Sequence, residues 1–185
     1  MVRFDATERA VHWATAALFL TLIATGASLY IGQLSVLVGR RHLVRTVHVT
    51  AGLLLPLPLI AGLAGRWGRA LRRDVSRLGR FAPGEWRWFR RGQRADVVLD
   101  KFNPGQKLNA AFVAGAMPVM LATGSIMKWF GPFPLSWRTG ATFVHDWMFL
   151  ALTVVVVGHV GKALADPDAL RGMVRGTVPA SWTRR

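Results

Sequence analysis

The sequence predicts an all-α integral membrane protein, in which residues 1–185 form a single domain built from four transmembrane helices. Two observations lead to this fold class. Apolar residues make up 52% of the chain, yet the formal net charge is +15, and the two properties separate along the sequence. Four apolar stretches approach or exceed the roughly 20 residues that a helix needs to cross a bilayer, and most of the charge lies between them. The chain has no cysteine, which excludes disulfides and iron–sulfur clusters bound by the chain itself.

The four predicted spans cover residues 9–33, 46–63, 108–127 and 140–163. Stretches such as 14–24 and 149–158 are apolar on every side, whereas a helix of a soluble bundle carries a polar stripe. The first span is too long for the apolar part of a cleavable signal peptide, and no small-residue cleavage site follows it. We therefore expect it to remain as a membrane span.

The distribution of positive charge predicts the orientation of the bundle. Nineteen of the 24 Lys and Arg residues lie in the N-terminal arm, in the loop 64–107 and in the tail that begins at Lys162. Loops rich in Lys and Arg stay on the cytoplasmic side of the membrane. Both termini are therefore predicted to be cytoplasmic, in a multi-pass protein of the cytoplasmic (inner) membrane.

The basic loop 64–107 is expected to lie against anionic lipid, with Leu71, Val75 and Leu78 on the apolar face of a short surface helix. The aromatic residues Trp86 and Trp88 among arginines could also stack on bases. We favour a solvated or partner-docking surface, and no nucleic-acid partner is expected.

Four of the five histidines, His12, His48, His145 and His159, lie inside predicted spans. Polar groups are costly to bury in lipid, and ionisable residues within spans usually mark a functional site. His42 falls in the short outer loop and is expected to be solvated.

The spacing of these histidines predicts two sites at different depths. His145 and His159 are 14 residues apart, which is about 21 Å along a helix and within roughly 40° of one face. His12 lies near the inner end of the first span and pairs in depth with His159, and His48 lies near the outer end of the second and pairs with His145. Two facing imidazoles with an iron between them form a bis-histidine haem site. Because both axial positions are then filled, such a haem transfers electrons, and the sequence predicts two haem b.

Glycines follow the same spacing. Gly26 comes 14 residues after His12, and Gly62 comes 14 residues after His48, so each could let a helix approach a flat macrocycle. Ordinary helix packing is the alternative for either glycine. Ala-Thr-Gly at 24–26 also recurs at 122–124, and Val-His at 47–48 recurs at 144–145. An ancient duplication and chance similarity in apolar sequence both remain open as explanations.

From Glu-Arg-Ala-Val-His-Trp at 8–13 through to His159, the chain resembles the cytochrome b (gamma) subunit of membrane-bound formate dehydrogenases, within the bacterial dihaem cytochromes b. The resemblance implies the same four haem ligands. The most specific short match is Lys-Phe-Asn-Pro-Gly-Gln-Lys at 101–107, which in that family lines a menaquinone pocket. It implies a quinone site formed by Asn103, Gly105 and Gln106 close to His159. A helix start with Asn103 as its N-cap is the alternative.

The resemblance also implies a place in a larger complex. An outer catalytic subunit, expected to be a molybdenum enzyme, and an iron–sulfur subunit would pass electrons to the outer haem, and quinone would be reduced near the cytoplasmic face. The chain would then be an electron-transfer subunit without substrate chemistry beyond the quinone. Three alternatives stay open: a cytochrome b subunit of a hydrogenase or another molybdenum oxidoreductase, a small histidine-using transporter, and a plain membrane anchor. A transporter would gather its histidines near the midplane.

Overall fold

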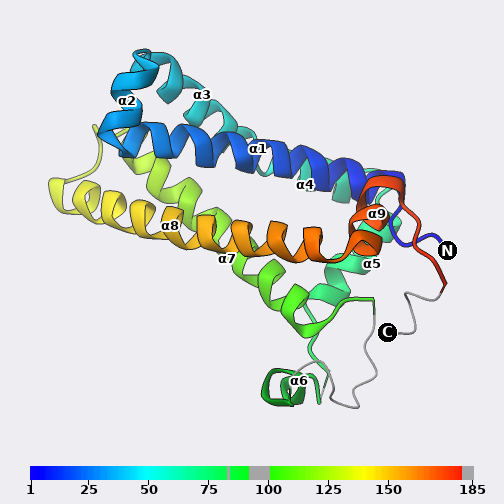
Figure 1. The fold of residues 1–185 in the computed structure, drawn as a ribbon. Coiled ribbons are helices and arrows are strands. Elements are labelled where there is room, and N and C mark those ends of the chain that lie inside the picture. The colour runs from blue at the N-terminus through cyan, green and yellow to red at the C-terminus, as the bar shows by residue number, and fades with distance from the viewer. Residues whose placement is uncertain (83, 92–100, 181–185) are drawn as a thin grey trace.

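The computed structural model describes residues 1–82, 84–91 and 101–180, which form nine α-helices (Figure 1). They are α1 (Ala6–Tyr30), α2 (Gly32–Val38), α3 (Arg41–Leu54), α4 (Leu57–Ala64), α5 (Arg69–Leu78), α6 (Glu85–Arg91), α7 (Pro104–Lys128), α8 (Leu135–Ala165) and α9 (Pro167–Arg175). Residues 92–100 of the basic loop and the end of the C-terminal tail lie outside the described residues.

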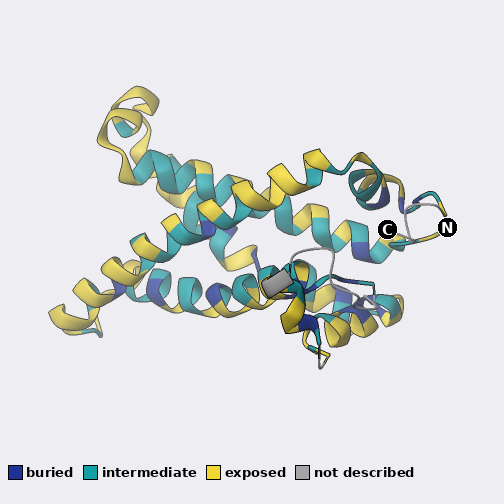
Figure 2. Cartoon of the chain, turned by 60° about the horizontal axis from the view of Figure 1, so that its bottom comes forward, coloured by how far each residue is buried: buried dark blue, intermediate teal, exposed yellow. Residues whose placement is uncertain are grey.

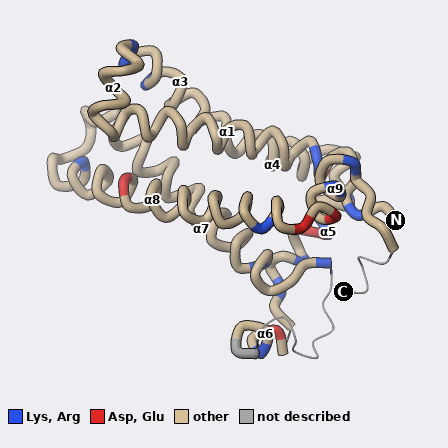
Figure 3. The backbone as a smooth tube through the Cα atoms, in the orientation of Figure 1, with Lys and Arg blue, Asp and Glu red and all other residues tan. Residues whose placement is uncertain are grey.

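Four helical segments among these residues are long and apolar enough to cross a membrane: α1, the run of α3 and α4, α7, and α8. Charged residues gather toward the ends of these segments (Figure 3). Exposed residues are spread along the spans (Figure 2). Large apolar residues are among them, such as Leu20 at 57% and Val157 at 67% exposed. Extended apolar surface of this kind is stable when lipid covers it. The predicted all-α fold with four membrane spans is confirmed.

The first helix begins at Ala6, three residues before the predicted start, because a capping box precedes it. The Glu8 backbone N–H donates to Asp5 Oδ1 at 2.8 Å, and the Asp5 N–H donates to Glu8 Oε2 at 2.6 Å. These bonds satisfy two backbone donors that a helix start leaves unpaired. The helix ends at Tyr30 rather than at residue 33, since Ile31 is extended and α2 follows it.

The second span begins at Arg41 and not at residue 46, so His42 lies in the first turn of a helix instead of a loop, where it is exposed. The span is interrupted at Leu55 and Pro56, because proline has no N–H to continue the hydrogen-bond ladder, and it resumes as α4. Pro118 lies inside α7 without ending it. The third and fourth spans extend beyond the predicted ranges at both ends.

The spans pack as two pairs. α1 lies along α3 and α4, and α7 lies along α8, whereas α1 and α8 approach each other at only a few places. The two ends of the described chain meet at one end of the bundle (Figure 1), where Val2 and Thr177 form an antiparallel bridge. The N-terminal amine also donates to the Val178 carbonyl at 3.0 Å. The N-terminal arm and the described part of the C-terminal tail therefore lie at the same end of the bundle.

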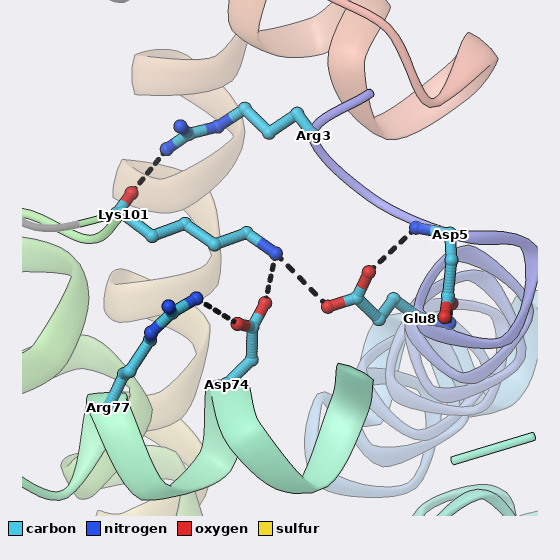
Figure 4. A network of polar contacts seen from close by, with 6 residues as sticks. All are labelled: Arg3, Asp5, Glu8, Asp74, Arg77 and Lys101. Carbon is cyan, nitrogen blue, oxygen red and sulfur yellow. Dashed lines mark hydrogen bonds and ion pairs between the residues drawn. The ribbon is translucent and has the colours of Figure 1, made fainter. Parts of the chain in front are cut away.

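A network of buried charges ties the basic loop to this end of the bundle (Figure 4). Lys101 Nζ donates to Glu8 Oε1 at 3.1 Å and also to Asp74 on α5. Arg77 reaches Asp74 at 3.3 Å, and the Arg3 guanidinium donates to the Lys101 carbonyl. The segment before α7 is thereby joined to α1 and α5.

The helix α5 packs against protein on one side. Leu71 and Asp74 are buried, and a Cβ placed on Gly62 of α4 would lie 2.7 Å from Leu71 Cδ2. Leu71 was expected to face lipid, and this expectation is wrong because the side chain fills the space beside Gly62. Val75 is 41% exposed, so part of the helix surface is free to meet lipid.

A second buried ion pair fixes α6. Lys107 Nζ in the first turn of α7 donates to Glu85 Oε1 at 2.7 Å and to the Arg80 carbonyl at 2.8 Å. Both side chains are almost fully buried. Two lysines, Lys101 and Lys107, therefore anchor the arginine-rich loop to the bundle.

Candidate functional site

The structure brings the four intramembrane histidines together as two pairs. The ring centres of His12 on α1 and His159 on α8 are 6.1 Å apart, with their planes inclined by 51°. Those of His48 on α3 and His145 on α8 are 6.3 Å apart, with an inclination of 66°. Because α8 is one continuous helix, the 14 residues between its two histidines separate the pairs by about 21 Å. These are the pairs that the spacing predicted.

The separation within each pair fits an iron ion between the rings. Imidazole nitrogens bind metal ions at about 2 Å, and about 1 Å separates a ring nitrogen from the ring centre. Two axial imidazoles on one iron therefore place their ring centres about 6 Å apart, as observed in both pairs.

Two histidine ligands are too few for a metal ion bound by protein alone, but they suit an iron that a macrocycle also binds. Within the described part of the chain, no group of three or more His, Cys, Asp or Glu side chains is placed to hold a bare metal ion. A tetrahedral zinc site takes four ligands and a catalytic one at least three from protein. A porphyrin supplies four nitrogens in its plane, so two histidines complete the coordination.

A threonine contacts each ring of the His48–His145 pair. Thr25 Oγ1 on α1 lies 2.9 Å from His48 Nδ1, and Thr123 Oγ1 on α7 lies 2.9 Å from His145 Nδ1. Each threonine comes from a helix that carries no histidine of this pair. Nδ1 of both rings is thus engaged, and Nε2 is the nitrogen left for a metal.

The next residue after each threonine is a glycine that faces the same ring. A Cβ on Gly26 would lie 3.4 Å from His48 Cε1 and 3.3 Å from Phe149, and a Cβ on Gly124 would lie 3.3 Å from His145 Cε1. Both contacts are tight, so a larger residue would press on the histidine. The glycines therefore leave room for the histidine rings.

The other predicted glycine, Gly62, has a packing role. A Cβ there would lie 2.6 Å from Val11 Cγ2 as well as 2.7 Å from Leu71. Its small size lets α4 approach α1 and α5, which was the alternative interpretation of this position.

The His12–His159 pair lies toward the end of the bundle that carries the termini. Trp13 is edge-on to His12, with ring centres 5.3 Å apart, and its Nε1–H donates to the Met173 carbonyl of α9 at 3.2 Å. α9 therefore folds back onto the start of α1 beside this pair. Among the described residues no side chain forms a hydrogen bond with the ring of His12 or His159.

The predicted quinone residues lie where α7 begins. Asn103 is the N-cap: its Oδ1 accepts from the Gln106 N–H at 2.9 Å, and Gln106 Oε1 accepts from the Asn103 N–H at 3.0 Å. This capping box agrees with the alternative of a plain helix start. It uses only the two side-chain oxygens, however, and leaves the NH₂ groups of both amides to donate to a ligand.

Two connections relate this helix start to its surroundings. Gly105 lies under Trp88 of α6, since a Cβ there would be 3.3 Å from Trp88 Cη2. Lys101, two residues before Asn103, contacts Glu8, which precedes His12 by one turn of α1. Among the described residues, no hydrogen bond joins Asn103 or Gln106 to His159.

Sequence reasoning missed several residues of the site. Thr25 and Thr123 were visible only as part of the Ala-Thr-Gly repeat, and in the structure each of them contacts one histidine of the Val-His repeat. Trp88 was assigned to an outward-facing surface and instead covers Gly105. No periodicity in the sequence marks this contact.

Comparison with protein families identifies the chain. Residues 3–176 match the family described as prokaryotic cytochrome b561. The chain belongs to this family. It is therefore a multi-pass membrane cytochrome, and membership of the cytochrome b561 family implies haem b and electron transport. The ring separation in both histidine pairs fits the binding of a haem iron.

Relatives within the curated proteins carry a more specific description. The formate dehydrogenase cytochrome b556(fdo) subunit of Escherichia coli strain K12 is 25% identical over 200 residues, covering 100% of this chain and 89% of the relative. The formate dehydrogenase cytochrome b556 subunit of Haemophilus influenzae is 23% identical over 193 residues, covering 100% of this chain and 79% of the relative.

Proposed function

We propose that this chain is the dihaem cytochrome b subunit of a formate dehydrogenase-type complex, and that it carries electrons across the membrane to a quinone. The observation that carries the proposal is the pair of histidine separations, 6.1 and 6.3 Å, in two layers of one bundle. The similarity to formate dehydrogenase subunits over the whole chain supports the assignment to that type of complex.

The end of the bundle that carries both termini faces the cytoplasm in this proposal. The N-terminal arm, the basic loop and the C-terminal tail hold nineteen of the 24 Lys and Arg residues, and the described parts of these segments lie at that end. The positive-inside rule favours this orientation in the cytoplasmic membrane. His12 and His159 then form the inner layer, and His48 and His145 the outer layer.

The histidines of each layer bind one haem b, which accepts and releases single electrons when bound. The protein contributes rigidity and position. His145 and His159 stand on one unbroken helix, so their spacing is fixed, and their partners come from α1 and α3, which pack along each other. The continuous helix α8 and the close packing of α1 along α3 keep both layers at a constant separation.

Quinone binds at the start of α7 in this proposal. The amide NH₂ groups of Asn103 and Gln106 donate to a quinone carbonyl, and Gly105 lets Trp88 pack closely on the start of α7, where its ring supplies an apolar wall. The capping box holds the two amides at a fixed separation, because each oxygen is already bonded to the backbone of the other residue. The inner position gives access to cytoplasmic protons.

Electrons enter from partner subunits at the opposite end. The short helix α2 exposes Val36 and Leu37 there, each at 82%, next to Arg40 and Arg41. Apolar surface rimmed by charge is typical of a docking site for another protein. An iron–sulfur subunit that serves an outer catalytic subunit, a molybdenum enzyme, is the partner that we propose for this surface.

The test is the haem content of the purified chain, measured by the difference between dithionite-reduced and oxidised spectra. We expect two haems per chain in the wild type. His12→Ala and His159→Ala should lose the same haem, and His48→Ala and His145→Ala the other. His42→Ala is the matched control, since His42 is exposed on α3, and it should keep both haems. A wild-type chain without haem, or variants that lose haems in a different pairing, would contradict the proposal.

A further inference from the structure

The two histidine layers differ in what holds their rings. Both rings of the outer pair contact a threonine hydroxyl at 2.9 Å, from two different helices, whereas no side chain among the described residues forms a hydrogen bond with the inner pair. A side-chain hydrogen bond on each ring of one pair, and none from the described surroundings on the rings of the other pair, indicates that the two sites differ in their chemistry.

The hydrogen bonds define which nitrogen of each outer ring carries the proton. The Thr25 hydroxyl donates to the Thr21 carbonyl at 2.6 Å, and the Thr123 hydroxyl donates to the Val119 carbonyl at 2.8 Å. A hydroxyl has one hydrogen, so at the ring each threonine can only accept. Nδ1 of His48 and of His145 is therefore the N–H donor, and Nε2 carries the lone pair.

The same hydrogen bonds also affect the reduction potential of an iron that the histidines hold. An acceptor on the N–H of a metal-bound imidazole increases the electron density of the ring and makes it a stronger base. A more basic ligand stabilises the oxidised iron relative to the reduced iron, which lowers the reduction potential. In the outer layer both His48 and His145 would receive this effect when they hold the iron.

We propose that Thr25 and Thr123 are positioning residues that hold the outer histidines in the Nε2-binding tautomer and lower the reduction potential of the outer haem below that of the inner one. This inference rests on the proposed function. The lower potential makes transfer from the outer to the inner layer downhill, which matches electrons that enter outside and leave to quinone inside. The hydroxyl groups of Thr25 and Thr123 thereby favour electron transfer from the outer haem to the inner one.

The perturbation is to replace each threonine by valine, which keeps the branched shape and removes the acceptor. We expect the ferric-to-ferrous ratio of the outer haem at a fixed potential to fall about threefold for Thr25→Val or Thr123→Val, which for one electron corresponds to about 30 mV. The double variant should approach tenfold, or about 59 mV, because the two threonines act on different ligands.

The assay is spectroelectrochemical titration of the purified chain, with the outer haem identified as the one missing from His48→Ala. Thr153→Val is the matched control. Its hydroxyl donates to the Phe149 carbonyl at 2.8 Å within α8 and contacts no histidine, so the substitution should leave both potentials unchanged. Thr25→Ser and Thr123→Ser keep the acceptor and should behave as the wild type.

The outcomes separate this inference from the proposal on which it rests. An outer potential that rises in the valine variants and returns in the serine variants supports the role, as does loss of the outer haem from the valine but not the serine variants. Two haems with an unchanged outer potential, or a shift of the inner haem instead, would overturn it while leaving the proposed function intact. A wild-type chain that binds no haem would overturn the proposed function itself.

Discussion

Replacing Lys101 by methionine should destabilise the protein substantially, because the lysine is the cation between two buried carboxylates. Its Nζ contacts Glu8 and Asp74 (Figure 4), whose side chains are 6% and 7% exposed. Removing one partner of a buried ion pair costs about 3–5 kcal/mol, since the remaining charge stays desolvated. Lys101 is 16% exposed and Arg77 still reaches Asp74, so we expect the lower end, about 3 kcal/mol.

That loss should be visible in thermal unfolding followed by tryptophan fluorescence in detergent, which the eight tryptophans make practical. For a chain of this size 1 kcal/mol corresponds to about 2–4 °C in Tm. The variant should therefore unfold roughly 6–12 °C below the wild type at the same scan rate. Lys162→Met removes an exposed lysine from α8 and is the matched control, with an expected shift within about 1 °C.

A further variant tests the reason for the effect. The triple variant combines Lys101→Met with Glu8→Gln and Asp74→Asn. It lacks the two carboxylate charges that the lysine neutralised, so it should recover part of the lost Tm. Neutralising every member of a buried charged group is less costly than leaving one charge alone. A Tm for Lys101→Met equal to that of the wild type would refute the reasoning, and a triple variant less stable than Lys101→Met would show that charge burial is not the cause.

Two other predictions concern the haem layers and the quinone site. At Gly26 even a Cβ would lie 3.4 Å from His48 Cε1, so the larger side chain of Gly26→Val should displace the histidine and the outer haem should be lost. A Cβ on Gly140 would meet nothing within 4 Å, so Gly140→Val should keep both haems. Retention of both haems in the Gly26 variant would remove this residue from the site. Gln106→Glu keeps the oxygen that caps α7 and removes the NH₂ donor, so Tm should stay within about 1 °C while quinone reduction slows about tenfold, the loss of one hydrogen bond of about 1.4 kcal/mol. Gln106→Ala should slow turnover and also lower Tm, and unchanged turnover in both variants would exclude an amide role at this position.

The arrangement of the histidines also separates the cytochrome from the transporter considered on sequence grounds. A transporter site gathers its polar groups at one depth near the midplane. Here two pairs are about 21 Å apart along α8, and the described residues offer no third ligand to either pair. Membership of the cytochrome b561 family agrees with this geometry.

The sequence by itself determined the spans and the pairing of the histidines. Both follow from local rules: apolar length defines a membrane helix, and the regular rise and turn of that helix place His145 and His159 on one face at two depths. The start of α7 was equally readable, because the capping box of Asn103 and Gln106 involves residues three apart.

Only the tertiary structure decided what surrounds these residues. The hydrogen bond between His48 and Thr25 joins positions 23 residues apart, and the bond from Lys101 to Glu8 joins positions 93 apart. Such contacts depend on how helices rotate and cross, and that in turn depends on packing between segments rather than on the pattern within any one of them. The sequence therefore shows which side chains are candidates to bind a haem, and the packing of α1 against α3 and of α7 against α8 decides that Nδ1 of His48 and of His145 contacts a threonine.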